Sequence, residues 1–263
     1  MDYVFIVFVC GVAAEAALIL LLIKGRVYRT LPAFFLYMCW SLFSDGLLYY
    51  VRVRYPAAFF QTYLVQLILD SAMIFAVLVE VAWSVLRPIR GSLPKYSWIG
   101  IAALVAVGGL ILWPIAGLVA PQGLYASGMN LFRLQQTPAI LRAVFFLAMA
   151  GFSQVLSIGW RDRELQIATG LGFYSIVSLA ITILHTHQAT GTQQYHWLDV
   201  LGGVCYLCSL IYWVYCFATQ PAERREFSPQ MQSMLLAVAG AARSTRVAMT
   251  DSTPDKAGKQ RDR

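Results

Sequence analysis

Seven long apolar stretches, joined by short loops, are the feature that most constrains how this chain can fold. A hydrocarbon core about 30 Å thick is crossed by roughly 20 residues of helix, because each residue rises about 1.5 Å. Seven windows have this length and character, at about 3–23, 32–51, 61–86, 96–120, 138–159, 167–186 and 197–218. Residues 17–23 and 99–107 are apolar on every face, which is typical of helices in lipid. The sequence therefore predicts an all-α polytopic membrane protein whose residues 1–218 form a seven-transmembrane-helix bundle.

The positions of Lys and Arg predict the orientation of this bundle. Cytoplasmic loops of membrane proteins hold the excess of basic residues near the ends of the spans. Sixteen of the 20 basic residues follow spans one, three and five or lie in the C-terminal tail, and the others are Arg52, Arg54, Arg133 and Arg142. We therefore expect the N-terminus outside and the C-terminus in the cytoplasm. Topology and contact with the inner leaflet explain the net charge of +7, so no nucleic-acid partner is expected.

The two ends of the chain differ in character. The first window follows Met1-Asp2 without a positive segment and stays apolar for about twenty residues, so we interpret it as a retained first span rather than a signal peptide. Residues 219–263 are predicted to form a cytoplasmic tail. Ser228-Pro229 is typical of a helix start, and apolar residues then recur at helical spacing, which predicts an amphipathic surface helix over 229–249. The polar end of the tail is expected to be disordered.

Ionisable residues inside the spans indicate where a functional site is to be sought. A charged side chain in lipid costs a few kcal/mol or more, so such groups usually face the bundle interior or a wet cavity. Asp70 is expected near the midplane, Asp45 and Arg142 about 6 to 9 Å below the outer surface, and Asp199 at the outer mouth. Hydroxyl groups lie beside these charges at helical spacing. The sequence thus predicts an outward-facing polar pocket or buried charge network formed by Asp45, Asp70, Arg142, Asp199, Ser41 and Tyr206.

Two interpretations of these polar residues remain open. In the first, the pocket holds a small ligand or protons, and Arg142 is the partner of an anion or a carboxylate. In the second, Arg142 neutralises Asp45 or Asp70, and the hydroxyl groups bond across helices, as they do in many membrane bundles.

Two further acids require partners from elsewhere in the bundle. Glu80 and Arg87, at the cytoplasmic end of span three, are predicted to belong to an inner structural ion pair, in which Glu80 meets another helix or a basic residue of an inner loop. Glu15 lies in the middle of span one without a local partner, so another helix must supply one.

Three histidines near one outer turn raise the alternative of a metal site. His185, His187, His196 and Asp199 are together a zinc ligand set. Intramembrane hydrolases of the alkaline-ceramidase and progestin-receptor-like group also use seven helices, three histidines and an aspartate. Their last helix carries HxxxH, whereas this sequence has HTH and HWLD and no histidine in the early spans. Histidines at the membrane interface are the favoured interpretation, so we expect no cofactor, with zinc as the alternative.

Other chemistries of seven-helix proteins lack the residues that they need. Retinal proteins use a Lys in the last helix, and the lysines here are Lys24, Lys95, Lys256 and Lys259. The sequence has no Gly-rich phosphate loop, no GxSxG elbow and no HExxH. It therefore nominates no catalytic residue.

Spans two and three resemble a known group of proteins. The resemblance is carried by LPAFFLYMCWSLFSDGLLYYVRVRYPAAFFQTYLV and by EVAWSVLRP around Glu80 to Pro88. These segments are similar to a family of uncharacterised bacterial seven-helix integral membrane proteins, in which a proline- and aromatic-rich second span precedes a third span ending in Glu and a basic residue. The resemblance implies the seven-helix fold and a multi-pass location in the bacterial inner membrane, and it implies no activity.

Three classes of function follow from these observations. The favoured class is a non-enzymatic sensor or partner-binding protein, whose outer pocket is sealed below and whose inner loops and tail contact a cytoplasmic protein. The second is a small transporter or proton-coupled carrier, in which Asp70 and Glu80 relay protons or ions along a continuous path. The third is a zinc-dependent intramembrane hydrolase, which requires bound zinc.

Overall fold

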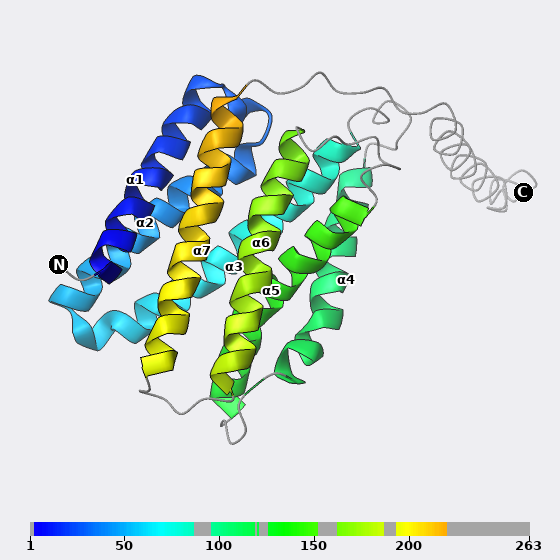
Figure 1. Cartoon of the computed structure of the whole chain (residues 1–263). Coiled ribbons are helices and arrows are strands. Elements are labelled where there is room, and N and C mark those ends of the chain that lie inside the picture. The colour runs from blue at the N-terminus through cyan, green and yellow to red at the C-terminus, as the bar shows by residue number, and fades with distance from the viewer. Residues whose placement is uncertain are drawn as a thin grey trace, which may run out of the picture.

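The chain folds into a bundle of long helices (Figure 1). A computed structural model describes residues 3–86, 96–118, 120, 126–151, 162–186 and 193–219. These residues form seven α-helices: α1 (Tyr3–Lys24), α2 (Pro32–Arg54), α3 (Phe59–Val85), α4 (Ser97–Leu118), α5 (Ala126–Gly151), α6 (Arg163–Thr186) and α7 (Gln193–Ala218). The prediction of an all-α chain is confirmed. The tail beyond residue 219, with the surface helix expected over 229–249, lies outside the described residues.

Six of these helices are long and apolar enough to cross a membrane, namely α1, α2, α3, α4, α6 and α7. Large apolar side chains cover the outside of the bundle, and Leu104, Leu110 and Leu118 of α4 are among the most exposed. In water such a surface would be costly, whereas in lipid it is the expected one. The protein is therefore a multi-pass membrane protein in contact with the lipid bilayer.

Helix α5 differs from its predicted span. The sequence favoured a helix start at Pro138 and a loop before it, but α5 begins at Ala126 and runs through Pro138 to Gly151. Proline has no backbone N–H, so the carbonyl four residues before it loses its helical donor. In a membrane bundle, groups from neighbouring helices can bond such a carbonyl. The turns before Pro138 carry Gln136 and Thr137, which the hydropathy pattern assigned to water although both are buried. The rest of the predicted span, 152–159, lies outside the described residues.

The helices close into a ring in chain order, because α7 packs against both α6 and α1. Helix α3 also contacts α5 and α6, so it crosses the middle of the bundle behind them (Figure 1). We name the two ends of the bundle by their loops. At the α1–α2 end, α1 ends at Lys24 and α2 begins at Pro32; at the α2–α3 end, α2 ends at Arg54 and α3 begins at Phe59.

The half of the bundle toward the α1–α2 end has a tightly packed apolar core. Leu18, Leu22 and Phe34 are fully buried there. The Phe34 ring meets Trp213 edge-on, with 5.3 Å between ring centroids, and the Trp213 indole Nε1 donates a hydrogen bond to the Gln166 carbonyl at 3.1 Å. Since lipid is as apolar as these side chains, the stabilisation comes from close van der Waals packing rather than from exclusion of water.

Candidate ligand-binding cavity

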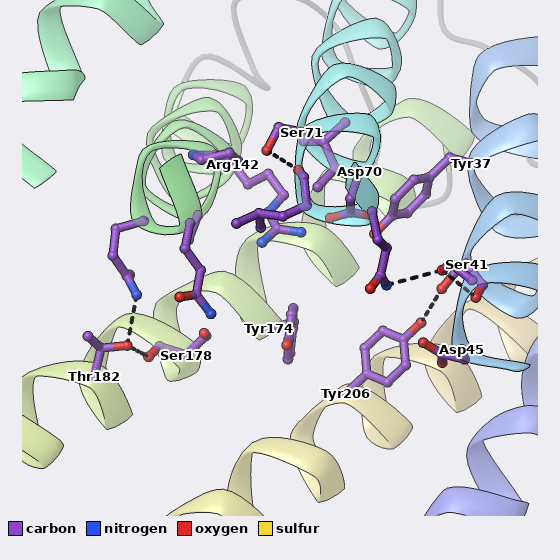
Figure 2. A pocket seen from close by; sticks show the side chains of 18 residues that line it. Tyr37, Ser41, Asp45, Asp70, Ser71, Arg142, Tyr174, Ser178, Thr182 and Tyr206 are labelled. Atoms are coloured by element: carbon purple, nitrogen blue, oxygen red, sulfur yellow. Dashed lines mark hydrogen bonds between the residues drawn. The ribbon is translucent and has the colours of Figure 1, made fainter. Parts of the chain in front are cut away.

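A cavity of about 400 Å³ lies among five helices, in the half of the bundle toward the α2–α3 end (Figure 2). Its wall is mostly polar, although the surrounding helices are apolar on their outer faces. The lining residues are Tyr37, Ser41, Ser44 and Asp45 of α2, Gln66, Leu67, Asp70, Ser71 and Ile74 of α3, Gln135, Gln136, Pro138, Ala139 and Arg142 of α5, Tyr174, Ser178 and Thr182 of α6, and Tyr206 of α7. The polar stripes of separate helices therefore meet at one place.

Arg142 supplies the positive charge of the cavity. Its side chain is only 8% exposed, and its guanidinium lies over the Tyr174 ring, 5.7 Å from the centroid. Figure 2 shows the guanidinium directed from α5 into the space between the helices. Among the described residues it has no carboxylate within salt-bridge distance, and its Nε atom makes no hydrogen bond. An aromatic face compensates a buried guanidinium only in part, and among the described residues the Tyr174 ring is the contact that Arg142 makes.

The two acids of the cavity also have no hydrogen-bond donor among the described residues. Asp45 and Asp70 are partly buried, and within the described part of the chain neither carboxylate receives a hydrogen bond. Arg142 is the opposite charge that acts on Asp70 through space, whereas Asp45 is near the like charges of Asp70 and Glu15. The cavity thus holds one cation and two acids, and these three groups form no ion pair with another described residue.

Two glutamines add unpaired acceptors to the same wall. Gln66 Nε2 donates to the Ser44 hydroxyl at 3.3 Å, and Gln136 Nε2 donates to the Thr182 hydroxyl at 3.2 Å. Both amide groups are oriented by these bonds, and each leaves its buried Oε1 atom without a donor. Among the described residues, the wall therefore offers two buried amide oxygens besides its charged groups.

Glu15 lies directly beside the cavity and joins three helices. Its side chain is 1% exposed in the middle of α1. Its Oε1 atom accepts hydrogen bonds from the Ser41 hydroxyl, at 2.9 Å, and from the Tyr206 hydroxyl, and the two hydroxyl groups lie 3.1 Å apart. Because Ser41 and Tyr206 also line the cavity, this three-residue contact connects the cavity to α1.

Replacement of Tyr206 by Phe is expected to destabilise the protein by about 1 to 2 kcal/mol, since Glu15 loses a donor in a buried position. Thermal unfolding in detergent, followed by tryptophan fluorescence, measures the effect. Tyr215→Phe is the matched control on the same helix, because Tyr215 is 69% exposed. Equal melting temperatures for the two variants would show that the hydroxyl of Tyr206 contributes nothing to the bundle.

Glu80 lies at the α1–α2 end, away from the cavity. Its two carboxylate oxygens accept the backbone N–H groups of Ala33 and Phe34, each at 2.9 Å. These amides belong to the first turn of α2, where the helix itself offers no acceptor and the dipole favours a negative charge. The predicted partner Arg87 lies outside the described residues, so the inner ion pair stays a prediction. The contacts that the structure gives to Glu80 make it an interhelical cap of α2.

The predicted site residues fall into two groups. Asp45, Asp70, Arg142, Ser41 and Tyr206 all line the cavity. Asp199 lies on α7, but its side chain lies outside the described part of the chain.

The predicted metal ligands are only partly described. His185 lies near the end of α6, His187 is not among the described residues, and the side chain of His196 on α7 is not described either. Within the described ranges no group of three or more His, Cys, Asp or Glu side chains could hold a metal. His187 and the side chains of His196 and Asp199 lie outside these ranges, so the zinc site stays a prediction.

Several residues of the cavity were not predicted from the sequence. Gln135 and Gln136 were assigned to a loop because Pro138 was taken as the helix start. Tyr174 was missed although it precedes Ser178 and Thr182 by one and two helical turns, a spacing that places the three side chains on one face. That spacing was the available signal for Tyr174.

Comparison with known proteins gives this chain no relative: no protein-family model, no curated protein and no solved structure matches it. The chemistry of the cavity is therefore the feature that points to a function.

Proposed function

We propose that this protein is a non-enzymatic seven-helix sensor of the bacterial inner membrane, which binds a small polar ligand in the cavity. One observation carries the proposal: buried Arg142 and the acids Asp45 and Asp70 share one cavity without forming an ion pair. A purely structural network would pair these charges, because each unpaired buried charge is costly. The volume of about 400 Å³ lies within the range of small-molecule sites.

In this proposal α5 is the seventh span. Its hydropathy is low because Gln136 and Arg142 lie within it, yet these side chains line the cavity rather than face lipid. On its other side, Val144 and Leu147 are exposed apolar residues suited to lipid. With seven spans, the basic residues place the N-terminus outside and the tail in the cytoplasm. The resemblance of spans two and three to a group of bacterial seven-helix proteins supports the same membrane.

An odd number of spans is directly testable, because it places the two termini on opposite sides of the membrane. In bacteria, a green fluorescent protein fused to the C-terminus is expected to fluoresce, and alkaline phosphatase fused there is expected to be inactive. An N-terminal epitope tag is expected to be accessible on intact spheroplasts. If α5 does not span, both termini lie on the same side, and the tag and the fusion report the same compartment.

The packing of the half of the bundle toward the α1–α2 end favours a sensor over a carrier. A carrier needs a polar path through both halves of the bundle. In the described residues, the half toward the α1–α2 end is packed mainly with buried apolar side chains such as Leu22, Phe34 and Trp213, and its buried Ser84 and Glu164 bond to each other. Glu80, the second acid of the hypothetical relay, is engaged by backbone amides. The proposed response to the ligand is a change in helix packing, which a cytoplasmic partner senses through the inner loops and the tail.

Filling the cavity with a bulky side chain is expected to abolish ligand binding. Protein in lipid nanodiscs is screened against a library of small polar metabolites by thermal unfolding. A ligand at a hundred times its Kd stabilises the folded state by about 2.7 kcal/mol, which corresponds to a rise in Tm of about 5 to 10 °C for a chain of this size. We expect this rise in the wild type and its loss in Ser178→Trp, since Ser178 lines the cavity.

The control is Ile176→Trp, an exposed position on the same helix, which is expected to retain the shift. A library without any active compound, or a shift that survives Ser178→Trp, would contradict the proposed site. Transport of the active compound into proteoliposomes would identify a carrier instead.

A further inference from the structure

We infer that the ligand is a small amino-acid-like zwitterion, with one carboxylate bound by Arg142 and one primary ammonium bound by Asp45 and Asp70. This inference rests on the proposed function and specifies the ligand of the same cavity. The charges and positions of the polar groups in the wall support it.

Arg142 suits a carboxylate. A guanidinium presents its N–H donors as a planar fork that matches a carboxylate in a bidentate arrangement. The Tyr174 ring holds the guanidinium from one face, and the Nε donor remains unused. A phosphate monoester carries nearly two negative charges and would face one cation and two acids in the same cavity. A carboxylate, with a single charge, is the better match.

The acidic part of the wall suits an ammonium group. Figure 2 shows Asp70 and Asp45 on the same side of Arg142, with Tyr174 next to the guanidinium. Besides the two carboxylates, Gln66 offers a buried oxygen without a donor. An ammonium group has three donors and no acceptor, so it satisfies such a wall without adding unpaired acceptors. A neutral polyol brings at least as many acceptors as donors and leaves both acids uncompensated.

The contributions of the carboxylate and of the ammonium group to binding can be separated with related compounds. Each series contains a zwitterion, the amine that lacks its carboxylate and the acid that lacks its ammonium group. The intact protein in phosphatidylcholine nanodiscs is titrated calorimetrically with L-leucine, 3-methylbutylamine and 4-methylpentanoate. The serine series uses L-serine, 2-aminoethanol and 3-hydroxypropanoate, and the tyrosine series uses L-tyrosine, tyramine and 3-(4-hydroxyphenyl)propanoate. Glucose and myo-inositol represent neutral polyols. We expect at least one zwitterion to bind roughly tenfold or more tighter than both of its relatives, because each relative lacks one charge-assisted contact.

Two variants assign the contacts. Arg142→Gln is expected to bind the zwitterion and its amine relative equally, and Asp70→Asn is expected to reduce the preference of the zwitterion over its acid relative. Arg52→Gln is the matched control, since Arg52 is exposed and lies outside the cavity. Arg142→Lys keeps the charge without the fork and replaces Arg142→Gln if that variant does not fold. It is expected to weaken zwitterion binding and to retain some preference over the amine.

The outcomes distinguish this inference from the proposed function. Binding of polyols alone, or of an amine or acid as tightly as its zwitterion, would overturn the zwitterion and leave a ligand-binding cavity in place, provided that Ser178→Trp removes the binding. Preferences unchanged by Arg142→Gln and Asp70→Asn would overturn the assigned contacts. If neither this panel nor the metabolite library binds the wild type, both proposals fail.

Discussion

Gly172→Ala is expected to destabilise the bundle by about 3 kcal/mol, at the upper end of the cost of overpacking. A Cβ atom on Gly172 of α6 would overlap with the Cβ and Cγ atoms of Phe146 on α5. No rotamer of Phe146 moves its own Cβ, so the two helices must separate. Small residues at helix interfaces in membranes let the two backbones approach closely, and this close approach supplies the packing. The same two helices carry Arg142 and Tyr174, so binding in the cavity is expected to weaken as well.

Thermal unfolding in detergent measures this effect, and the expected fall in Tm is about 6 to 12 °C. Gly46→Ala is the matched control, because nothing lies within 4 Å of the position of its Cβ atom. That variant is expected to be neutral or slightly stabilising, since alanine has less backbone freedom to lose than glycine. A Gly172→Ala variant as stable as Gly46→Ala would mean that α5 and α6 are not as closely packed as described.

Helical periodicity in the sequence predicted which residues could share the cavity. Ser41 and Asp45 are four residues apart on α2, and Gln66 and Asp70 are four apart on α3, so each pair lies on one helix face. An apolar environment makes it costly to turn such faces toward lipid, which is why polar faces of different helices converge. Most of the cavity wall follows from these two rules.

The same rules could not specify which partners meet. Glu15 needed a partner from another helix, but nothing in the pattern of α1 identifies Tyr206, which comes from the other end of the chain. Which helices pack against each other depends on how the whole ring closes. The sequence of a single helix does not predict this. The start of α5 was wrong for a related reason. Hydropathy treats Gln136 as a residue for water, although its amide nitrogen donates to Thr182 inside the bundle.

The role of Glu80 was hidden because its partners are backbone groups. The prediction named another helix or a basic residue of an inner loop as the partner, and the amides of Ala33 and Phe34 on α2 carry no side-chain signal that would identify them. Pro32 was the available clue. It occupies the first turn of α2, and the N–H groups that follow a helix start need acceptors from elsewhere.

Glu80→Ala is expected to destabilise the protein by about 3 to 5 kcal/mol, because it leaves two part-buried amides at the start of α2 without their acceptors. Glu80→Gln retains one acceptor oxygen and is expected to cost about half as much. Gln61→Ala, an exposed position on the same helix, is the control in the same melting experiment and is expected to be near neutral. A proton relay at Glu80 makes the opposite prediction, in which Glu80→Gln keeps full stability and removes proton-coupled uptake into proteoliposomes. Measuring both quantities on the same Glu80→Gln preparation therefore decides whether this carboxylate holds α2 in place or carries protons.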